Sequence, residues 1–169
     1  NNYSKPNNIL INNSYHILWL DIYSNQKQIS KRGKDILKYL AIWENPKYES
    51  DFFFTKGYRN EIYVKSALEN LSKPKEKLIH TFFWFDIETE EDKKIYNLVN
   101  NHHLDEAIGI LKEWENKKNL ALLYCISLLY KKMESGDLDL SQESIKLFKE
   151  ISEDDKFWKA FEKKYFLFD

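Results

Sequence analysis

The residues of this chain best placed to do chemistry are a group of cations between positions 27 and 38. Five basic residues fall within these twelve positions, beside a single acid, Asp35. In a helix they would lie mostly on the face opposite the apolar residues, where they could meet an acidic protein surface or nucleic acid. The candidate partner-binding residues are therefore Lys27, Lys31, Arg32, Lys34 and Lys38.

The kinds of residue in and around this group bear on what it would bind. Only two of the 26 basic residues of the chain are arginine, the residue that makes bidentate contacts with bases and phosphates. The composition therefore favours a protein partner over nucleic acid, although Tyr39 and Trp43 nearby could stack on bases. A third interpretation is a solvated helix face in a lysine-rich protein.

No group of residues in the sequence forms a recognisable catalytic or metal-binding motif. His102 and His103 stand near Asp105 and Glu106, but adjacent helical side chains point about 100° apart and do not converge on one zinc ion. We interpret these residues as the polar start of a helix, with the acids favoured in its first turn. Glycine-rich phosphate loops, HExxH and CxxC are also absent from the sequence. We expect no enzyme activity, no cofactor and no metal.

Three isolated residues have reactive side chains. Cys125 lies in the most apolar segment, where burial would raise the pKa of its thiol and make it unreactive. His80 adjoins an aromatic cluster, so we expect it to be packed rather than catalytic. His16 follows Tyr15 in a short apolar segment, and we expect it to face solvent or to cap a neighbouring element.

The composition is that of a globular protein. Of 169 residues, 43% are hydrophobic and 31% are charged, which excludes a disordered chain. Four Gly and three Pro disfavour a turn-rich all-β fold, and one Cys excludes a disulfide scaffold. The longest apolar run, 120–130, is shorter than the roughly 20 residues that span a bilayer, so we expect no membrane partner. Residues 1–85 carry a net charge of +5 and residues 86–169 carry −6, which suggests two modules.

The first half of the sequence predicts four helices after an arm at 1–14 that docks through its ILI run. The first covers the apolar segment 15–21, and the second, 25–41, starts with a capping box of Asn25 and Gln28. Asn45-Pro46 then breaks the pattern, and we expect the DFFF run at 51–54 to tuck under a loop. A third helix begins near Asn60, and Pro74 opens a fourth. The FFWF run, 82–85, is interpreted as the seam between the halves.

The second half predicts antiparallel helices. Segments 95–101 and 104–114 are joined by a turn, and an almost continuously apolar helix, 119–133, must be central. Gly136 is expected to end that helix. Ser141 is expected to cap a helix that reaches Ile151, and a capping box at 152–155 predicts a last helix over 155–166. Strand-like alternation is absent, so the sequence predicts an all-α fold.

Several of these segments resemble the J-domain (DnaJ-type) co-chaperones. YHILWLD at 15–21 is similar to the family's first helix, usually Tyr-x-x-Leu-Gly-Leu, with Trp19 in place of the Gly. SNQKQISKRGKDILKYL, 24–40, is similar to the second helix in its polar start, Ile29 and basic outer face. VKSALENLSKPKEK, 64–77, resembles the end of the third helix.

The resemblance covers roughly residues 15–80 and implies a J-like helical hairpin. Family members that stimulate the ATPase of a DnaK-type chaperone carry His-Pro-Asp after the second helix. Aligning on Ile29 puts Ala41-Ile42-Trp43 at that place, and His-Pro-Asp occurs nowhere in the sequence. The resemblance therefore implies docking to a chaperone or another partner through the basic face, without ordinary stimulation.

The second half is similar to tetratricopeptide-type helical repeats at HLDEAIGILKEW, 103–114, where Ala107 would allow two helices to approach closely. We therefore expect three parts: an arm at 1–14, a J-like domain at 15–85 packed on the rest, and a tetratricopeptide-like segment at 86–169. The predicted function is a cytoplasmic, non-catalytic adaptor that binds a protein, with a DnaK-type chaperone as candidate partner and nucleic acid as the alternative. The sequence leaves the oligomeric state open. Because the chain starts without Met and ends on an apolar run, we expect it to be part of a longer protein.

Overall fold

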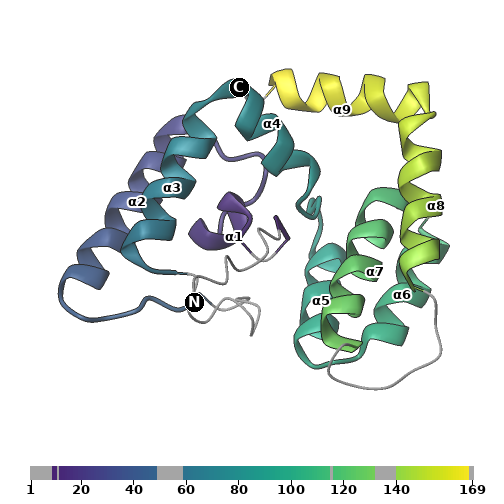
Figure 1. Ribbon diagram of the computed structural model, residues 1–169, viewed down its shortest axis with the longest axis horizontal. Helices are drawn as coiled ribbons and strands as arrows, with labels where there is room; N and C mark the ends of the chain where they lie inside the picture. The colour runs from purple at the N-terminus through teal and green to yellow at the C-terminus, as the bar shows by residue number, and fades with distance from the viewer. Residues whose placement is uncertain (1–8, 11, 49–58, 115, 132–139, 168–169) are drawn as a thin grey trace, which may run out of the picture. The chain divides into compact units, whose positions relative to one another are not determined.

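The computed structural model describes residues 9–10, 12–48, 59–114, 116–131 and 140–167, and every regular element within them is an α-helix (Figure 1). The predicted all-α fold is therefore confirmed for these residues. They belong to two compact units, of which the first ends at Trp84 and the second is Phe85–Leu167. The division falls inside the FFWF run. The DFFF run, Ile11 and Gly136 lie outside the described residues.

The first unit places one short helix, α1 (Ser14–Leu18), among three longer ones. α2 (Gln26–Ala41) and α3 (Glu61–Ser72) run antiparallel and pack against each other, and α4 (Pro74–Phe82) follows α3 almost directly (Figure 1). α1 contacts all three of these helices. The antiparallel pair is the element that presents the predicted basic surface.

The ends of these helices follow the local signals in the sequence. Asn25 Oδ1 accepts from the Gln28 amide at 2.9 Å, and Gln28 Oε1 accepts from the Asn25 amide at 2.8 Å, which completes the predicted capping box of α2. Asn60 Oδ1 accepts from the Tyr63 amide at 3.0 Å and caps α3. Pro74 is the first residue of α4, where its missing amide hydrogen costs no hydrogen bond. All three predicted starts are confirmed.

The contact between α2 and α3 depends on a glycine. Ile29 and Ile36 of α2 are fully buried, and Gly33 lies between them. A Cβ at Gly33 would overlap the side chain of Leu68 on α3. Glycine therefore lets the two helices approach closely at this level, and Leu68 fills the space that a side chain would otherwise take.

α1 is held in the core by hydrogen bonds to the end of α4. The side chain of Asn13, which caps α1, donates from Nδ2 to the His80 carbonyl at 2.9 Å. The Ser14 amide donates to His80 Nδ1 at 3.0 Å, and the Tyr15 hydroxyl bonds Thr81 Oγ1 at 2.9 Å. Burial lowers the pKa of His80, which favours the neutral ring that can accept through Nδ1. His80 is therefore packed, as predicted.

The prediction for His16 is wrong. Its side chain is completely buried, and its ring stacks on the indole of Trp84 with centroids 4.7 Å apart. The reason is that α1 is covered on every side, so even its polar residues are enclosed. A five-residue helix has no solvent face to which a histidine could be assigned from periodicity.

The second unit is built around α7. Its helices are α5 (Glu90–Asn100), α6 (Leu104–Glu113), α7 (Lys117–Lys131), α8 (Leu140–Ser152) and α9 (Asp155–Leu167). α7 packs against α6 and most extensively against α8. Leu122, Leu123 and Ile126 are fully buried, so the prediction that this apolar helix is central is confirmed.

Two predicted helix caps in this unit are wrong. Ser141 lies inside the first turn of α8, which starts at Leu140. At the start of α9, Asp154 is the cap, since its Oδ1 accepts from the Lys156 and Phe157 amides at 3.0 and 3.2 Å. Ser152 is still within α8 and donates its hydroxyl to the Lys149 carbonyl at 2.7 Å. Both errors came from choosing among adjacent polar residues, any of which can cap.

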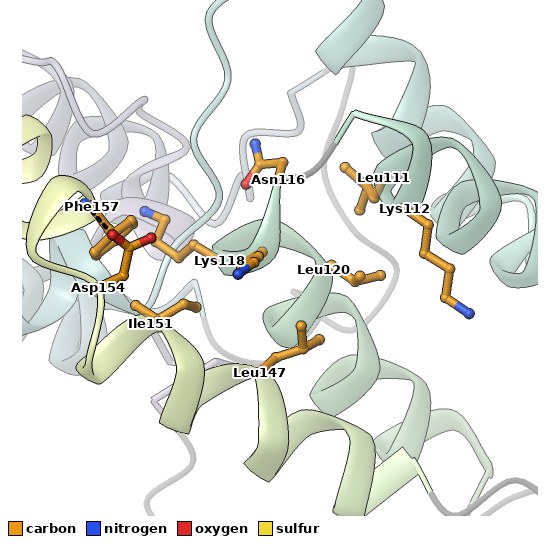
Figure 2. A pocket seen from close by; sticks show the side chains of 10 residues that line it. Leu111, Lys112, Asn116, Lys118, Leu120, Leu147, Ile151, Asp154 and Phe157 are labelled. Carbon is orange, nitrogen blue, oxygen red and sulfur yellow. Dashed lines mark hydrogen bonds between the residues drawn. The ribbon is translucent and has the colours of Figure 1, made fainter.

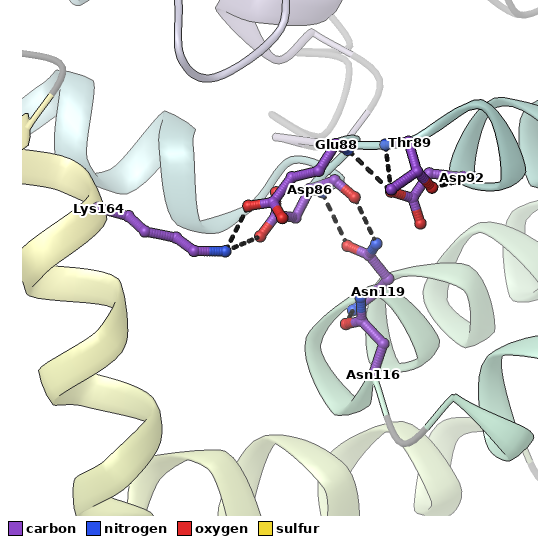
Figure 3. A network of polar contacts seen from close by, with 7 residues as sticks. All are labelled: Asp86, Glu88, Thr89, Asp92, Asn116, Asn119 and Lys164. Carbon is purple, nitrogen blue, oxygen red and sulfur yellow. Dashed lines mark hydrogen bonds and ion pairs between the residues drawn. The ribbon is translucent and has the colours of Figure 1, made fainter.

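A polar network connects the entry of the second unit to α7 and α9 (Figure 3). Asp86 and Asn119 exchange two hydrogen bonds, from the Asp86 amide to Asn119 Oδ1 and from Asn119 Nδ2 to the Asp86 carbonyl, each 2.9 Å long. Lys164 of α9 lies 2.5 Å from Glu88 Oε1 and 3.6 Å from Asp86 Oδ2. The segment before α5 is thus held to the first turn of α7 and to α9.

Candidate partner-binding surface

The structure aligns four of the five predicted site residues in one row on α2. Positions four, three and four residues apart share one side of a helix, and all four side chains are exposed. The buried positions Ile29, Gly33 and Ile36 lie on the opposite side. We call this row the lysine stripe: Lys27, Lys31, Lys34 and Lys38.

The lysine stripe is electrostatically unfavourable for the isolated helix. Each lysine has another lysine three or four residues away, and like charges at these spacings cost about 0.2–0.5 kcal/mol per pair. Among the residues that the structure describes, no ion pair joins a stripe lysine to an acid. The stripe therefore adds nothing to the stability of the first unit, whereas it suits an anionic partner.

Arg32, the fifth predicted residue, has a different position. Its side chain is half-buried, and Nη1 donates to the carbonyls of Trp19 at 2.7 Å and Leu18 at 3.1 Å. Its guanidinium also lies 4.4 Å from the ring centre of Tyr48. Arg32 thus joins α2 to the end of α1, and the structure separates it from the lysine stripe.

The other arginine of the chain serves the same end of α1. Arg59 is 3% exposed and donates from Nε to the Ile17 carbonyl at 2.8 Å and from Nη1 to the Pro46 carbonyl at 3.0 Å. It lies on the Tyr48 ring as well, 4.8 Å from its centre. The last carbonyls of a helix have no partners within it, and the fork of a guanidinium can bond several of them at once. Both arginines of the chain therefore bond backbone carbonyls at the end of α1.

An apolar patch adjoins the C-terminal end of the lysine stripe. Ile42 follows Lys38 by four residues and is 63% exposed, and Tyr39 is 47% exposed. Trp43 is 98% exposed. A large aromatic side chain left in water beside a row of cations is typical of a binding anchor, since tryptophan is enriched among the residues that dominate interface energies.

The backbone at Trp43 is strained. Its φ is 62°, in the left-handed region that glycine adopts freely and bulky residues rarely occupy. The Glu44 amide donates to the Tyr39 carbonyl at 3.0 Å across this residue, so Trp43 stands where a helix usually ends in glycine. A tryptophan that is both strained and exposed here does nothing for the fold, which points to a role in binding.

The remaining candidates for chemistry have ordinary positions. Cys125 is half-buried, its sulfur lies 2.9 Å from Ser144 Oγ, and burial raises the pKa of the thiol, as predicted. His102 and His103 are exposed. In the described ranges no three His, Cys, Asp or Glu side chains gather closely enough to hold a metal ion. No helix in those ranges has the length and apolar character needed to cross a membrane.

Comparison with known proteins found no match to this chain among family models, curated proteins or solved structures.

The sequence indicated most, but not all, of this surface. Helical spacing was enough to find the lysine stripe, and proximity to find Tyr39 and Trp43. Ile42 was missed, although its place four residues after Lys38 on the polar face was a usable signal. The carbonyls bonded by Arg32 come from a helix thirteen residues earlier, and no local pattern reveals such a contact.

Proposed function

We propose that this protein is a non-catalytic adaptor that docks an acidic surface of a protein partner through the lysine stripe, with Trp43 as the apolar anchor. The observation that carries the proposal is the combination on one end of α2: four exposed lysines in a row and a strained, 98% exposed tryptophan beside them. Cations give a fast, steered encounter, and a buried aromatic anchor gives a slow dissociation. The like-charge lysines and the strained, exposed tryptophan both lower the stability of the free protein, and only a complex would make favourable contacts with them.

The resemblance to J-domain co-chaperones nominates a DnaK-type chaperone as the partner. Trp19 takes the place of the glycine in the family's first-helix motif, and its φ of 48° is a conformation natural to glycine. Ala41-Ile42-Trp43, which replaces His-Pro-Asp, contributes two members of the exposed apolar patch. We therefore propose docking without stimulation of the chaperone ATPase, in a cytoplasmic protein.

The second unit completes the adaptor in this proposal. α6 begins one turn after α5 ends and packs against it, and Ala107, in the segment similar to tetratricopeptide repeats, is fully buried. A small residue at such a contact lets two helices approach closely. A helical hairpin of this kind offers a second protein-binding surface.

Nucleic acid is the alternative partner, and the exposure of Tyr39 and Trp43 favours it specifically. Aromatic side chains beside lysines can stack on unpaired bases while the cations bind phosphates. Binding that releases counterions from four phosphates would weaken with salt at a log–log slope of roughly 3–4. Affinity for single-stranded oligonucleotides with that slope, and none for a chaperone, would replace the protein-adaptor proposal.

The substitution Lys34→Glu separates binding from stability. It turns the like-charge pairs with Lys31 and Lys38 into opposite-charge pairs, so the first unit should gain about 0.5–1 kcal/mol in free energy of unfolding. Binding to a DnaK-type chaperone, measured by titration calorimetry on the full chain, should weaken at least tenfold, because an acid now faces the acidic surface.

A matched control is Lys163→Glu on α9. Lys163 is also exposed, so the change in net charge is the same, but the reversal lies on another helix, away from the lysine stripe. Its chaperone affinity should equal that of the unmodified protein. Equal losses in both variants would reduce the effect to net charge and contradict a specific surface, and absent binding by the unmodified protein would remove the chaperone version.

The substitution Trp43→Gly tests the anchor. Glycine relieves the left-handed backbone strain, so the first unit should become more stable by about 1 kcal/mol. Loss of a central tryptophan should weaken the complex roughly 30-fold. Hydrogen exchange of the α2 and α3 amides gives the stability of the first unit, and calorimetry gives the affinity. Unchanged affinity would exclude Trp43 from the interface.

A further inference from the structure

Two features of the structure lie apart from the lysine stripe. One is a pocket of about 630 Å³ in the second unit, lined by residues of α6, α7, α8 and the start of α9 (Figure 2). Charged groups of its lining are engaged within the protein, since Lys117 pairs with Glu150 at 3.5 Å and Asp154 caps α9. The other is the joint between α1 and α4 in the first unit, where a hydrogen bond depends on the protonation of a buried ring.

Both ends of α1 are attached to the rest of the first unit. Its last carbonyls accept from Arg32 and Arg59. Its start is held by the C-terminal end of α4, where Asn13 Nδ2 donates to the carbonyls of His80 at 2.9 Å and Phe83 at 3.3 Å. Arginine stays charged at every pH at which proteins fold, whereas an imidazole titrates near neutral pH. The attachment at the start of α1 is therefore the one that acid can change.

The ring of His80 supplies an acceptor that α1 needs. The Ser14 amide is the first of the helix and has no carbonyl within it to bond, so it donates to His80 Nδ1 at 3.0 Å. The next amide, that of Tyr15, donates to Asn13 Oδ1 at 3.0 Å. A ring nitrogen accepts only while it carries no hydrogen, so the hydrogen of the neutral ring lies on Nε2. The bond to Ser14 therefore requires a neutral His80.

The surroundings of His80 favour that neutral ring. The residue is 7% exposed, and burial lowers its pKa below the usual 6.5. Among the described residues, Glu76, one turn earlier on α4, is the charged group whose field reaches the ring, and it raises the pKa less than burial lowers it. From α1 and α3 the joint receives the uncharged side chains of Asn13 and Asn70. A proton on Nδ1 would thus be buried and would face the Ser14 amide, donor against donor.

A second imidazole lies near the same joint. His16 of α1 is completely buried and stacks on Trp84, which follows His80 by four residues. The ring of His80 bonds the backbone of α1, so its protonation acts directly on the attachment of that helix. His16 is the natural control for any effect of acid on this part of the unit.

We propose that the joint between α1 and α4 is an acid-released latch, in which protonation of His80 breaks its bond to the Ser14 amide and frees the start of α1 while α2 and α3 stay paired. Once α1 is released, water reaches the ring, so the released form binds a proton more readily than the latched form. The latch is therefore closed above pH 6.5 and opens as pH falls through the lower pKa of the buried ring. This device does not depend on the partner proposed above.

Amide hydrogen exchange of the full chain, followed by NMR at pH 7.5 and pH 5.0, tests the latch. The reporters are Ile17 and Leu20, whose amides donate to the carbonyls of Asn13 and Tyr15 at 2.9 Å. Their protection is the exchange rate of an unstructured chain divided by the measured rate at the same pH. It should be lower at pH 5.0 by roughly tenfold or more, whereas the protection of the α2 and α3 amides should change by less than about threefold.

Two variants separate the imidazoles. In His80→Asn, the side-chain oxygen lies near the place of Nδ1 and can accept the Ser14 amide, but it does not titrate. This variant should therefore protect α1 equally at both pH values. His16→Phe keeps an aromatic ring on Trp84 and should show the same acid effect as the unmodified protein. An acid effect that persists in His80→Asn and disappears in His16→Phe would overturn the latch.

Titration of the His80 ring in the unmodified protein needs no variant. Its nitrogen chemical shifts should place the hydrogen on Nε2 at pH 7.5 and give a protonation midpoint below 6.5 that coincides with the loss of α1 protection. A midpoint at or above 6.5, a hydrogen on Nδ1, or equal protection of α1 at both pH values would each contradict the proposal. A loss shared equally by α2 and α3 would also contradict it, because the whole first unit would then unfold in acid.

Discussion

Replacing Arg59 with methionine is expected to lower the free energy of unfolding of the first unit by about 2–5 kcal/mol. The guanidinium is 3% exposed and bonds the carbonyls of Ile17 and Pro46 at 2.8 and 3.0 Å. Methionine has a similar volume but no donor, so the buried Ile17 carbonyl and the part-buried Pro46 carbonyl would lose these bonds, at about 1–3 kcal/mol each. Hydrogen exchange of the α2 and α3 amides measures the change within the same unit.

Two companion variants show whether the fork geometry matters. Arg59→Lys keeps the charge but offers one compact ammonium, which cannot span both carbonyls, so it should recover less than half of the loss. Arg32→Met should cost less, about 1–2 kcal/mol, because that side chain is only half-buried. If Arg59→Met lost under 1 kcal/mol, or if Arg59→Lys kept full stability, the proposed role of Arg59 in holding α1 would be wrong.

Replacing Lys118 with methionine is expected to have the opposite sign and to stabilise the second unit by up to about 3 kcal/mol at pH 7. Burial lowers the pKa of Lys118 to about 8 in the folded protein, against the ordinary 10.5 of a lysine, and each pKa unit corresponds to about 1.4 kcal/mol. Methionine fills the same space without a charge to bury, and such replacements are often stabilising. Hydrogen exchange of the α7 amides reports the stability of this unit separately.

The pH dependence of this gain has a definite sign. Between pH 8 and 10.5 the unfolded chain holds a proton on Lys118 that the folded protein has released, so the unmodified unit becomes more stable as pH rises. The stabilisation by methionine should therefore be full below pH 8 and disappear near pH 10.5. A gain that is independent of pH would show that Lys118 is not buried as a cation.

Together these variants indicate that binding residues lower the folding stability of the free protein. Lys34 and Trp43 are each expected to lower the stability of the free chain, and each has a proposed role in binding a partner. Such trade-offs are common where a binding site needs exposed cations or a strained backbone. Arg59 differs, because its side chain holds α1 in place and its replacement should lower the stability of the first unit.

Local signals decide the helices and their ends. Each helix start described above depends on groups within four residues of one another, so it could be predicted from the sequence. These starts are the capping box of Asn25 and Gln28, the cap Asn60 and the first-turn Pro74. The lysine stripe follows for the same reason, because a helix places residues four and three apart on one side. The all-α class and the central place of α7 also follow from periodicity and apolar content.

What only the tertiary structure decided are the contacts between residues far apart in the chain. His16 is buried because Trp84, 68 positions later, stacks on it, and the roles of Arg32 and Arg59 depend on carbonyls of α1. Lys118 lies in the first turn of its helix, which is usually solvated, but here α9 and the segment at Asp86 lie beside its ammonium group. Periodicity and capping act through bonds within one turn. Burial and charge compensation depend on which surfaces meet in three dimensions, and that is set by packing over the whole unit.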